Sequence, residues 1–166
     1  MSITALLEVM GEITEVHTEL LALAKEKTPL LVRNEVEELN RVIHKENNCI
    51  KRMTELDQSR LHFLGEYLVK RGYHPNPKVT ISDLIRIIYK AEEKQSLTDA
   101  QVALAKVIAE LQTVNTLNQE MIKQSLAFID YSLDLLVGSP ENEVTYQHPA
   151  MQKQTGTRAG VFNAKA

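Results

Sequence analysis

The sequence predicts an all-α protein: an elongated antiparallel bundle of three long helices plus one short connector helix, with a flexible C-terminal tail. Its 166 residues are 43% hydrophobic, enough for a single core. Aromatic residues make up only 5% and Trp is absent, whereas Leu, Ile, Val, Ala, Glu and Lys dominate, a balance typical of long helices and coiled coils. Apolar residues recur at steps of three and four, and no alternating strand pattern competes with them.

Glycine and proline divide the chain into a body and a tail. Three of the six glycines and two of the five prolines fall at or after Gly138. We therefore predict a helical bundle over residues 1–138 and a flexible tail over 139–166. The tail is too poor in apolar residues to bury much surface alone, so its amides should exchange quickly in the isolated protein. Met151, Val161 and Phe162 are its candidate anchors on a partner.

The first helix begins at about residue 3 and carries one apolar stripe. Pro29 removes a backbone donor and disfavours helical geometry at Thr28, so we expect a kink or pause there before the helix resumes through Arg33. The stripe comprises Ile3, Leu6, Leu7, Met10, Ile13, Leu21 and Ala24.

The second helix is expected to begin at Glu35, because Asn34 followed by Glu37 has the pattern of an N-cap and capping box. Gly72, which can adopt a left-handed C-cap conformation, ends it. Its predicted apolar face consists of Val36, Leu39, Ile43, Ile50, Met53, Leu61, Leu64 and Leu68.

Two further helices follow a connector over residues 73–78, which contains two prolines. Thr80 with Asp83 three residues later opens a short helix whose apolar pattern fades over residues 92–96. Thr98 and Gln101 form a second capping-box pattern, so the last helix is predicted to start there and to continue to Gly138. That length matches the second helix and favours antiparallel neighbours.

Composition argues against several classes of partner. The 19 basic and 22 acidic residues give a net charge of −3, which offers no general attraction for nucleic acid or anionic lipid. No apolar run is long enough to span a bilayer, and Glu8 and Glu12 interrupt any leader-like segment. The single cysteine cannot form an intrachain disulfide. We therefore expect a soluble cytoplasmic protein without direct membrane insertion.

No constellation for catalysis, metal or cofactor binding is found in the sequence. There is no Gly-rich phosphate loop and no Cys-x-x-Cys pair, and none of the five histidines follows a Glu at the spacing of di-iron bundles. His17 and Cys49 are interpreted as packed bundle residues. Glu46 and Arg60 fall on or beside the apolar face of the second helix, as rim residues, a buried pair or a contact for a bound protein. We predict a protein that is not an enzyme.

The last helix carries two apolar seams. The first is assigned to the bundle core and comprises Leu104, Ile108, Leu111, Ile122, Leu126, Ile129, Leu133 and Leu136. The second follows a four-three rhythm on another face and comprises Leu117, Met121, Phe128, Tyr131 and Leu135. Met and aromatic residues suit the recognition of a partner helix, although the second seam could equally face a neighbouring helix of the bundle.

The chain resembles the FlgN family of flagellar type III export chaperones. The resemblance rests on the order of several segments along one chain that ends in a polar, Tyr-containing tail. These segments are residues 20–25 of the first helix, residues 34–39, Glu46, Arg60, residues 115–118 (Asn-Thr-Leu-Asn), and residues 121–129 followed by Leu133, Leu136 and Gly138.

The resemblance implies binding, not catalysis. Such chaperones hold the helical C-terminal segment of hook-filament junction proteins in the cytoplasm, prevent its premature self-association, and aid its delivery to the membrane export gate. By this resemblance, Tyr146 in the tail joins the second seam as a candidate partner contact. The alternative is a structural or adaptor coiled coil whose extra apolar faces serve self-association. The sequence leaves open which junction protein is bound and whether the body or the tail contacts the gate.

Overall fold

The computed structural model describes residues 3–74, 76 and 78–137. These residues form four helices, α1 (Ile3–Arg33), α2 (Val36–Lys70), α3 (Ile81–Ile87) and α4 (Ala91–Val137), and no strand. The predicted all-α class is confirmed. The chain divides into two units, residues 1–126 and 127–166, which are described separately. The predicted tail, including Tyr146, lies outside the described residues, and the predicted division into body and tail stays a prediction.

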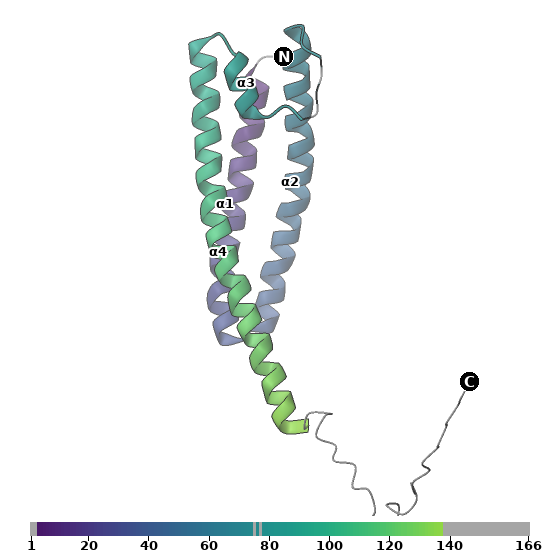
Figure 1. Ribbon diagram of the computed structural model, residues 1–166, viewed down its shortest axis with the longest axis vertical. Helices are drawn as coiled ribbons and strands as arrows, with labels where there is room; N and C mark the ends of the chain where they lie inside the picture. The colour runs from purple at the N-terminus through teal and green to yellow at the C-terminus, as the bar shows by residue number, and fades with distance from the viewer. Residues whose placement is uncertain (1–2, 75, 77, 138–166) are drawn as a thin grey trace, which may run out of the picture. The chain divides into compact units, whose positions relative to one another are not determined.

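Helices α1 and α2 form an antiparallel pair (Figure 1). Ion pairs join them across the pair at two levels, from Lys27 to Glu46 and from Arg52 to Glu12, so residue numbers rise along one helix as they fall along the other. Between the helices lies a buried apolar cluster, which excludes water over most of their length. It comprises Val9, Ile13, Val16, Leu23, Leu30, Val42, Cys49 and Leu56.

The predicted apolar face of α2 is only partly the face that packs against α1. Val42, Cys49 and Leu56 are buried at seven-residue steps, whereas Val36, Ile43, Ile50 and Leu61 of the predicted face are exposed. Of the predicted face, Leu64 and Leu68 are buried, and Leu39 and Met53 are half-buried against the cluster between α1 and α2. Both stripes have the period of a helix, so periodicity could not decide which one faces α1. The four exposed members of the predicted stripe lie beside the contact with α1.

Asn34 ends α1 and does not cap α2, contrary to the prediction. Its φ of 54° is left-handed, and the Asn34 amide donates to the Leu31 carbonyl while the Glu35 amide donates to the Leu30 carbonyl at 3.1 Å. This pair of bonds is the Schellman motif, in which Asn replaces the usual Gly. Glu35 is the N-cap of α2 and makes no capping side-chain bond.

The turn chemistry at the other end of α2 agrees with the prediction. Gly72 has a φ of 78°, and its amide donates to the Val69 carbonyl while the Tyr73 amide donates to Leu68. Thr80 then caps α3: its hydroxyl accepts from the Asp83 amide, and the Asp83 carboxylate accepts from the Thr80 amide. Both the left-handed cap and the capping box are confirmed.

The predicted start of the last helix is wrong, whereas the first helix ends at Arg33 as predicted. Helix α1 continues through Pro29 to Arg33 without a pause; a kink at Pro29 stays a prediction. Helix α4 begins at Ala91 and not at Thr98, whose hydroxyl donates to the Lys94 carbonyl of the preceding turn. Its 47 residues span about 70 Å against about 53 Å for the 35 of α2, so the two lengths do not match. A capping-box pattern inside a helix is bypassed when the residues before it can also be helical.

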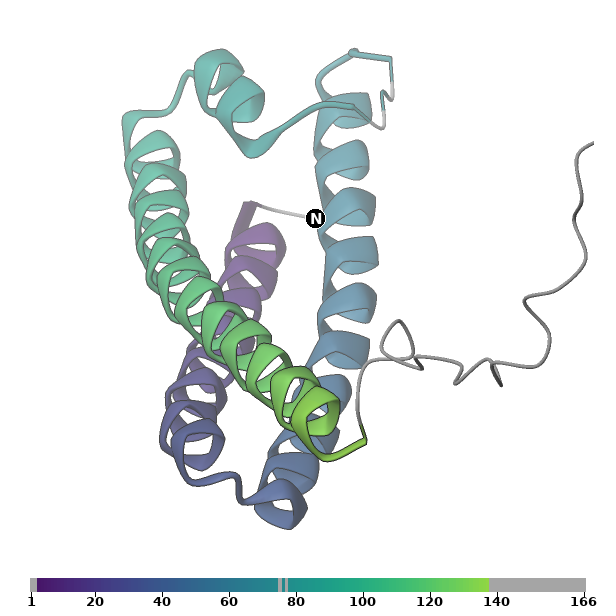
Figure 2. The ribbon, with the colours of Figure 1, turned by 60° about the horizontal axis from the view of Figure 1, so that its bottom comes forward.

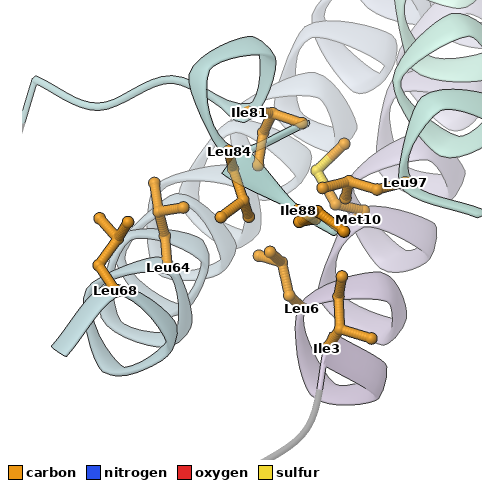
Figure 3. Packing of buried hydrophobic residues seen from close by; sticks show 9 residues of the cluster. All are labelled: Ile3, Leu6, Met10, Leu64, Leu68, Ile81, Leu84, Ile88 and Leu97. Atoms are coloured by element: carbon orange, nitrogen blue, oxygen red, sulfur yellow. The ribbon is translucent and has the colours of Figure 1, made fainter. Parts of the chain in front are cut away.

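A second apolar cluster joins all four helices within residues 1–126. Leu84 of α3 and Leu97 of α4 are fully buried there and point toward side chains of α1 and α2 (Figure 3). Leu97, predicted to precede the last helix, is instead a residue of α4 and packs in this cluster. The cluster comprises Ile3, Leu6, Met10, Leu64, Leu68, Ile81, Leu84, Ile88 and Leu97.

Candidate functional site

Asn118 of α4 hydrogen-bonds to two residues of α1. Its side chain is only 3% exposed, its Nδ2 donates to the Ala24 carbonyl at 2.8 Å, and its Oδ1 accepts from the Thr28 hydroxyl at 2.7 Å. Among the described residues of α4, only Leu97 and Asn118 are buried. A buried amide is stable only when its hydrogen bonds are made, so these bonds fix the position of α4 along α1.

A groove opens beside this contact, between α1, α2 and the part of α4 that belongs to residues 1–126. Its volume is about 420 Å³. We call it the α2–α4 groove; Figure 2 shows the three helices around it. The lining residues are Leu20, Lys27, Glu46, Ile50, Leu111, Asn115, Asn118, Gln119 and Ile122.

The charges in the groove neutralise each other. Lys27 Nζ lies 2.8 Å from Glu46 Oε1, and both side chains are largely shielded from solvent. The two positions that the sequence singled out on α2 do not pair with each other, because Arg60 binds Asp57 at 2.8 Å one turn away. Glu46 is thus a groove residue whose charge is already compensated.

The candidate partner-binding residues of the second seam are accessible on α4. Leu117 is 49% exposed, Phe128 70%, Tyr131 62% and Leu135 68%, whereas Met121 is half-buried. Leu117 and Met121 belong to the first unit, and the other three belong to the second. Whether the five act as one face stays a prediction, as does any role of Tyr146.

The first seam of α4 is not a continuous core stripe. Leu104, Ile108 and Leu111 are half-buried, but the seam residues from Ile122 onward are exposed. Ile122 lines the α2–α4 groove, where no helix of the described chain covers it. The core assignment is therefore wrong for the C-terminal half of the seam.

The described part of the second unit, residues 127–137, is one helical segment with no buried residue. Within residues 127–137, a single helix offers no second layer against which to bury its apolar side chains. The segment exposes seven large ones: Phe128, Ile129, Tyr131, Leu133, Leu135, Leu136 and Val137. Such a concentration of exposed apolar side chains marks an interaction surface.

His17 and Cys49 are packed residues, as interpreted from the sequence. His17 is half-buried, with Nδ1 2.9 Å from the Ile13 carbonyl oxygen. Cys49 is a buried free thiol; burial raises its pKa, and the nearby Glu19 carboxylate adds to the rise. A thiol of raised pKa is a poor nucleophile at neutral pH.

Neither a metal cluster nor a bilayer-spanning helix is found over residues 3–74, 76 and 78–137. Nowhere in this part of the chain do three or more His, Cys, Asp or Glu side chains gather as metal ligands would. No helix within these ranges is both long enough and apolar enough to cross a membrane.

An all-α fold with an exposed apolar helix surface, and with an interhelical groove whose charges compensate each other, is typical of a protein-binding molecule. The FlgN protein family matches residues 1–154, and the chain belongs to this family. The resemblance found in the sequence is thereby confirmed. FlgN proteins are a chaperone family, not a family of enzymes.

A curated relative extends over the whole chain. It is the uncharacterized protein YvyG of Bacillus subtilis (strain 168), 28% identical over 166 residues, with both chains fully covered. No solved structure matches the chain.

Sequence reasoning missed the groove and the role of Asn118. The sequence did contain a signal for Asn118. Leu111, Asn118 and Ser125 follow one another at seven-residue steps and so share one face of α4, where Asn118 follows the apolar Leu111. An amide at such a position predicts a specific hydrogen bond. Only the fold identifies the acceptor as the Ala24 carbonyl of another helix.

Proposed function

We propose that this protein is a cytoplasmic flagellar export chaperone that binds the helical C-terminal segment of hook-filament junction proteins. By covering the segment, it would prevent premature self-association and aid delivery to the type III export gate. The proposal includes the arrangement of the three long helices as one antiparallel bundle that presents the binding surface. Membership of the FlgN family supports the class of function.

The observation that carries the proposal is the exposed apolar surface of residues 127–137. A segment that self-associates through an apolar helical face needs a partner with a complementary apolar helix, which this surface offers. Aromatic side chains such as Phe128 and Tyr131 contribute strongly to binding, because each buries a large area at a small cost in side-chain entropy. Binding of this kind requires no catalytic group.

Titration with a junction-protein C-terminal peptide tests the proposal. The wild-type chain should form a complex on a sizing column, and replacement of Phe128 and Leu135 by Ser should weaken it by about tenfold or more. Both side chains are exposed, so the melting temperature should change little. Tyr89→Ser, at an exposed aromatic residue before α4, is the matched control and should bind normally.

The same experiment separates the chaperone from a self-associating coiled coil. A chaperone gives a new species of mixed composition when the peptide is added. An obligate coiled-coil dimer would elute unchanged with or without the peptide, and that result would refute the proposed function.

A further inference from the structure

The α2–α4 groove is bordered by an exposed apolar stripe on α2 and by the half-buried Leu111 and the exposed Ile122 on α4. On α2, Val36, Ile43 and Ile50 recur at seven-residue steps and are 62%, 39% and 53% exposed. Ile50 lines the groove, and the other two continue its stripe toward the start of α2. On α4, Leu111 and Ile122 line the opposite wall. The α2 stripe has the seven-residue period with which one helix packs against another, and Leu111 and Ile122 lie eleven residues apart on one face of α4.

The edges of the groove are uncharged. Next to the α2 stripe lie Asn40 and Asn47, again seven residues apart, and the α4 wall carries Asn115 and Gln119. In the described part of the chain, none of these four side-chain amides makes a hydrogen bond to another residue, and each of the four residues is exposed. Lys27 and Glu46, the charged residues of the lining, bind each other. A complementary occupant is therefore apolar along one stripe and uncharged but polar along its edges.

We propose that the α2–α4 groove receives one amphipathic helix of a partner protein, whose apolar stripe is flanked by Asn, Gln, Ser or Thr and not by charged residues. The helix packs its apolar side chains between Ile50 and Ile122, while Asn47, Asn115 and Gln119 hydrogen-bond its polar edge. This inference rests on the proposed function, which supplies a helical client, and it adds a second surface with a defined chemistry.

Helical geometry favours a partner helix over other occupants. A small charged ligand finds no free counter-charge in the lining, because Lys27 and Glu46 compensate each other. Residues 138–166 of the chain itself carry only Val144, Met151, Val161 and Phe162 as large aliphatic or Phe side chains, too few for a continuous stripe. A partner helix with heptad spacing matches the α2 stripe, and it can contact Leu111 and Ile122 on the opposite wall.

The first test uses the full chain and a labelled peptide of the junction-protein C-terminal segment. Replacing Ile50 and Ile122 together by Gln should weaken binding by about tenfold or more, while the matched pair Val69→Gln and Val102→Gln should stay within about twofold. Val69 and Val102 lie on the same two helices, are also exposed and do not line the groove. Since recognition is uncharged, the Kd should change by less than about threefold between about 0.05 and 0.5 M NaCl.

A photo-crosslinker in place of Gln119 identifies the occupant directly. Crosslinking to the peptide supports the proposal; a crosslink to residues 138–166 or to a second copy of the chain overturns the assigned occupant. If the wild-type chain binds the peptide but the groove pair binds equally well, the groove assignment fails while the proposed function stands. If the wild-type chain does not bind the peptide at all, both fail. A Kd that rises by more than about tenfold with salt would overturn the uncharged chemistry.

Discussion

A single polar side chain fixes the position of α4 along α1. Asn118 occupies a position where a Leu would bury more apolar surface, yet its two hydrogen bonds to α1 can form in one register only. An apolar side chain would tolerate sliding of α4 along α1. This contact lies at the proposed binding groove, which Asn118 also lines.

Removal of the Asn118 side chain should be costly. Asn118→Ala eliminates both bonds and leaves a small void, so the free energy of unfolding should fall by about 1–3 kcal/mol in urea denaturation. Asn115→Ala, at an exposed residue one turn earlier, is the control and should stay within about 0.5 kcal/mol. Equal effects of the two substitutions would contradict the role assigned to Asn118.

The thiol of Cys49 should react slowly in the native protein. Burial raises its pKa and excludes the reagent, so modification by a maleimide at neutral pH should be far slower than in urea. Because the folded-state pKa lies above the unfolded value, the contribution of the thiol to stability is present below the unfolded pKa of about 8.5 and is lost as pH rises through the folded pKa. Cys49→Ala should remove this alkaline component of the stability profile. Equally fast labelling of native and unfolded protein would refute the prediction.

Capping chemistry determines where the helical elements end. Asn34 and Gly72 both adopt left-handed backbone conformations that terminate α1 and α2, and Thr80 starts α3 with a reciprocal pair of bonds to Asp83. These local devices shape the connections at both ends of α2. By contrast, the capping pattern at Thr98 is unused, because α4 extends about two further turns toward its N-terminus, to Ala91.

Loss of the α3 cap should be measurable and pH-dependent. The Thr80 hydroxyl donates to the Asp83 carboxylate at 2.7 Å and lowers the pKa of that group. Thr80→Ala should therefore reduce the free energy of unfolding by about 1 kcal/mol at neutral pH. The contribution of the Asp83 carboxylate is present above its unfolded pKa of about 3.9 and is lost as pH falls through its lower folded pKa, so the gap between wild type and variant should narrow in acid.

Urea unfolding at neutral and acidic pH measures this difference. Thr113→Ala, at an exposed position inside α4, is the control; it should be neutral or slightly stabilising because Ala has the higher helix propensity. A gap between Thr80→Ala and wild type that stays constant down to about pH 2 would exclude the pH-dependent part of the prediction.

At the scale of the whole molecule, burial is concentrated within residues 1–126. Two clusters join α1 to α2 and bring in α3 and the start of α4, whereas the described residues of the second unit bury nothing. Local stability follows the number of buried apolar contacts. A helix without such contacts opens easily and gains most from a partner.

Hydrogen exchange should show this contrast. Amides of residues 127–137 should exchange about a hundredfold faster or more than those of residues 42–64 in the free protein. Addition of the junction-protein peptide should slow exchange in residues 127–137. Equally slow exchange in the two regions of the free chain would show that the second unit is packed, contrary to the prediction.

The sequence by itself determined the all-α class, the family, the cap at Thr80 and the left-handed Gly72, because these features depend on local periodicity and backbone chemistry. The tertiary structure alone decided which stripe of α2 faces α1, that Asn34 ends a helix instead of starting one, and that Asn118 binds the Ala24 carbonyl. A helical period defines that a face is apolar but not which neighbour covers it, since several faces of one helix can share that period. The uncovered groove beside Ile50 and Ile122 arises from that choice between faces, and only the packing of the helices could disclose it.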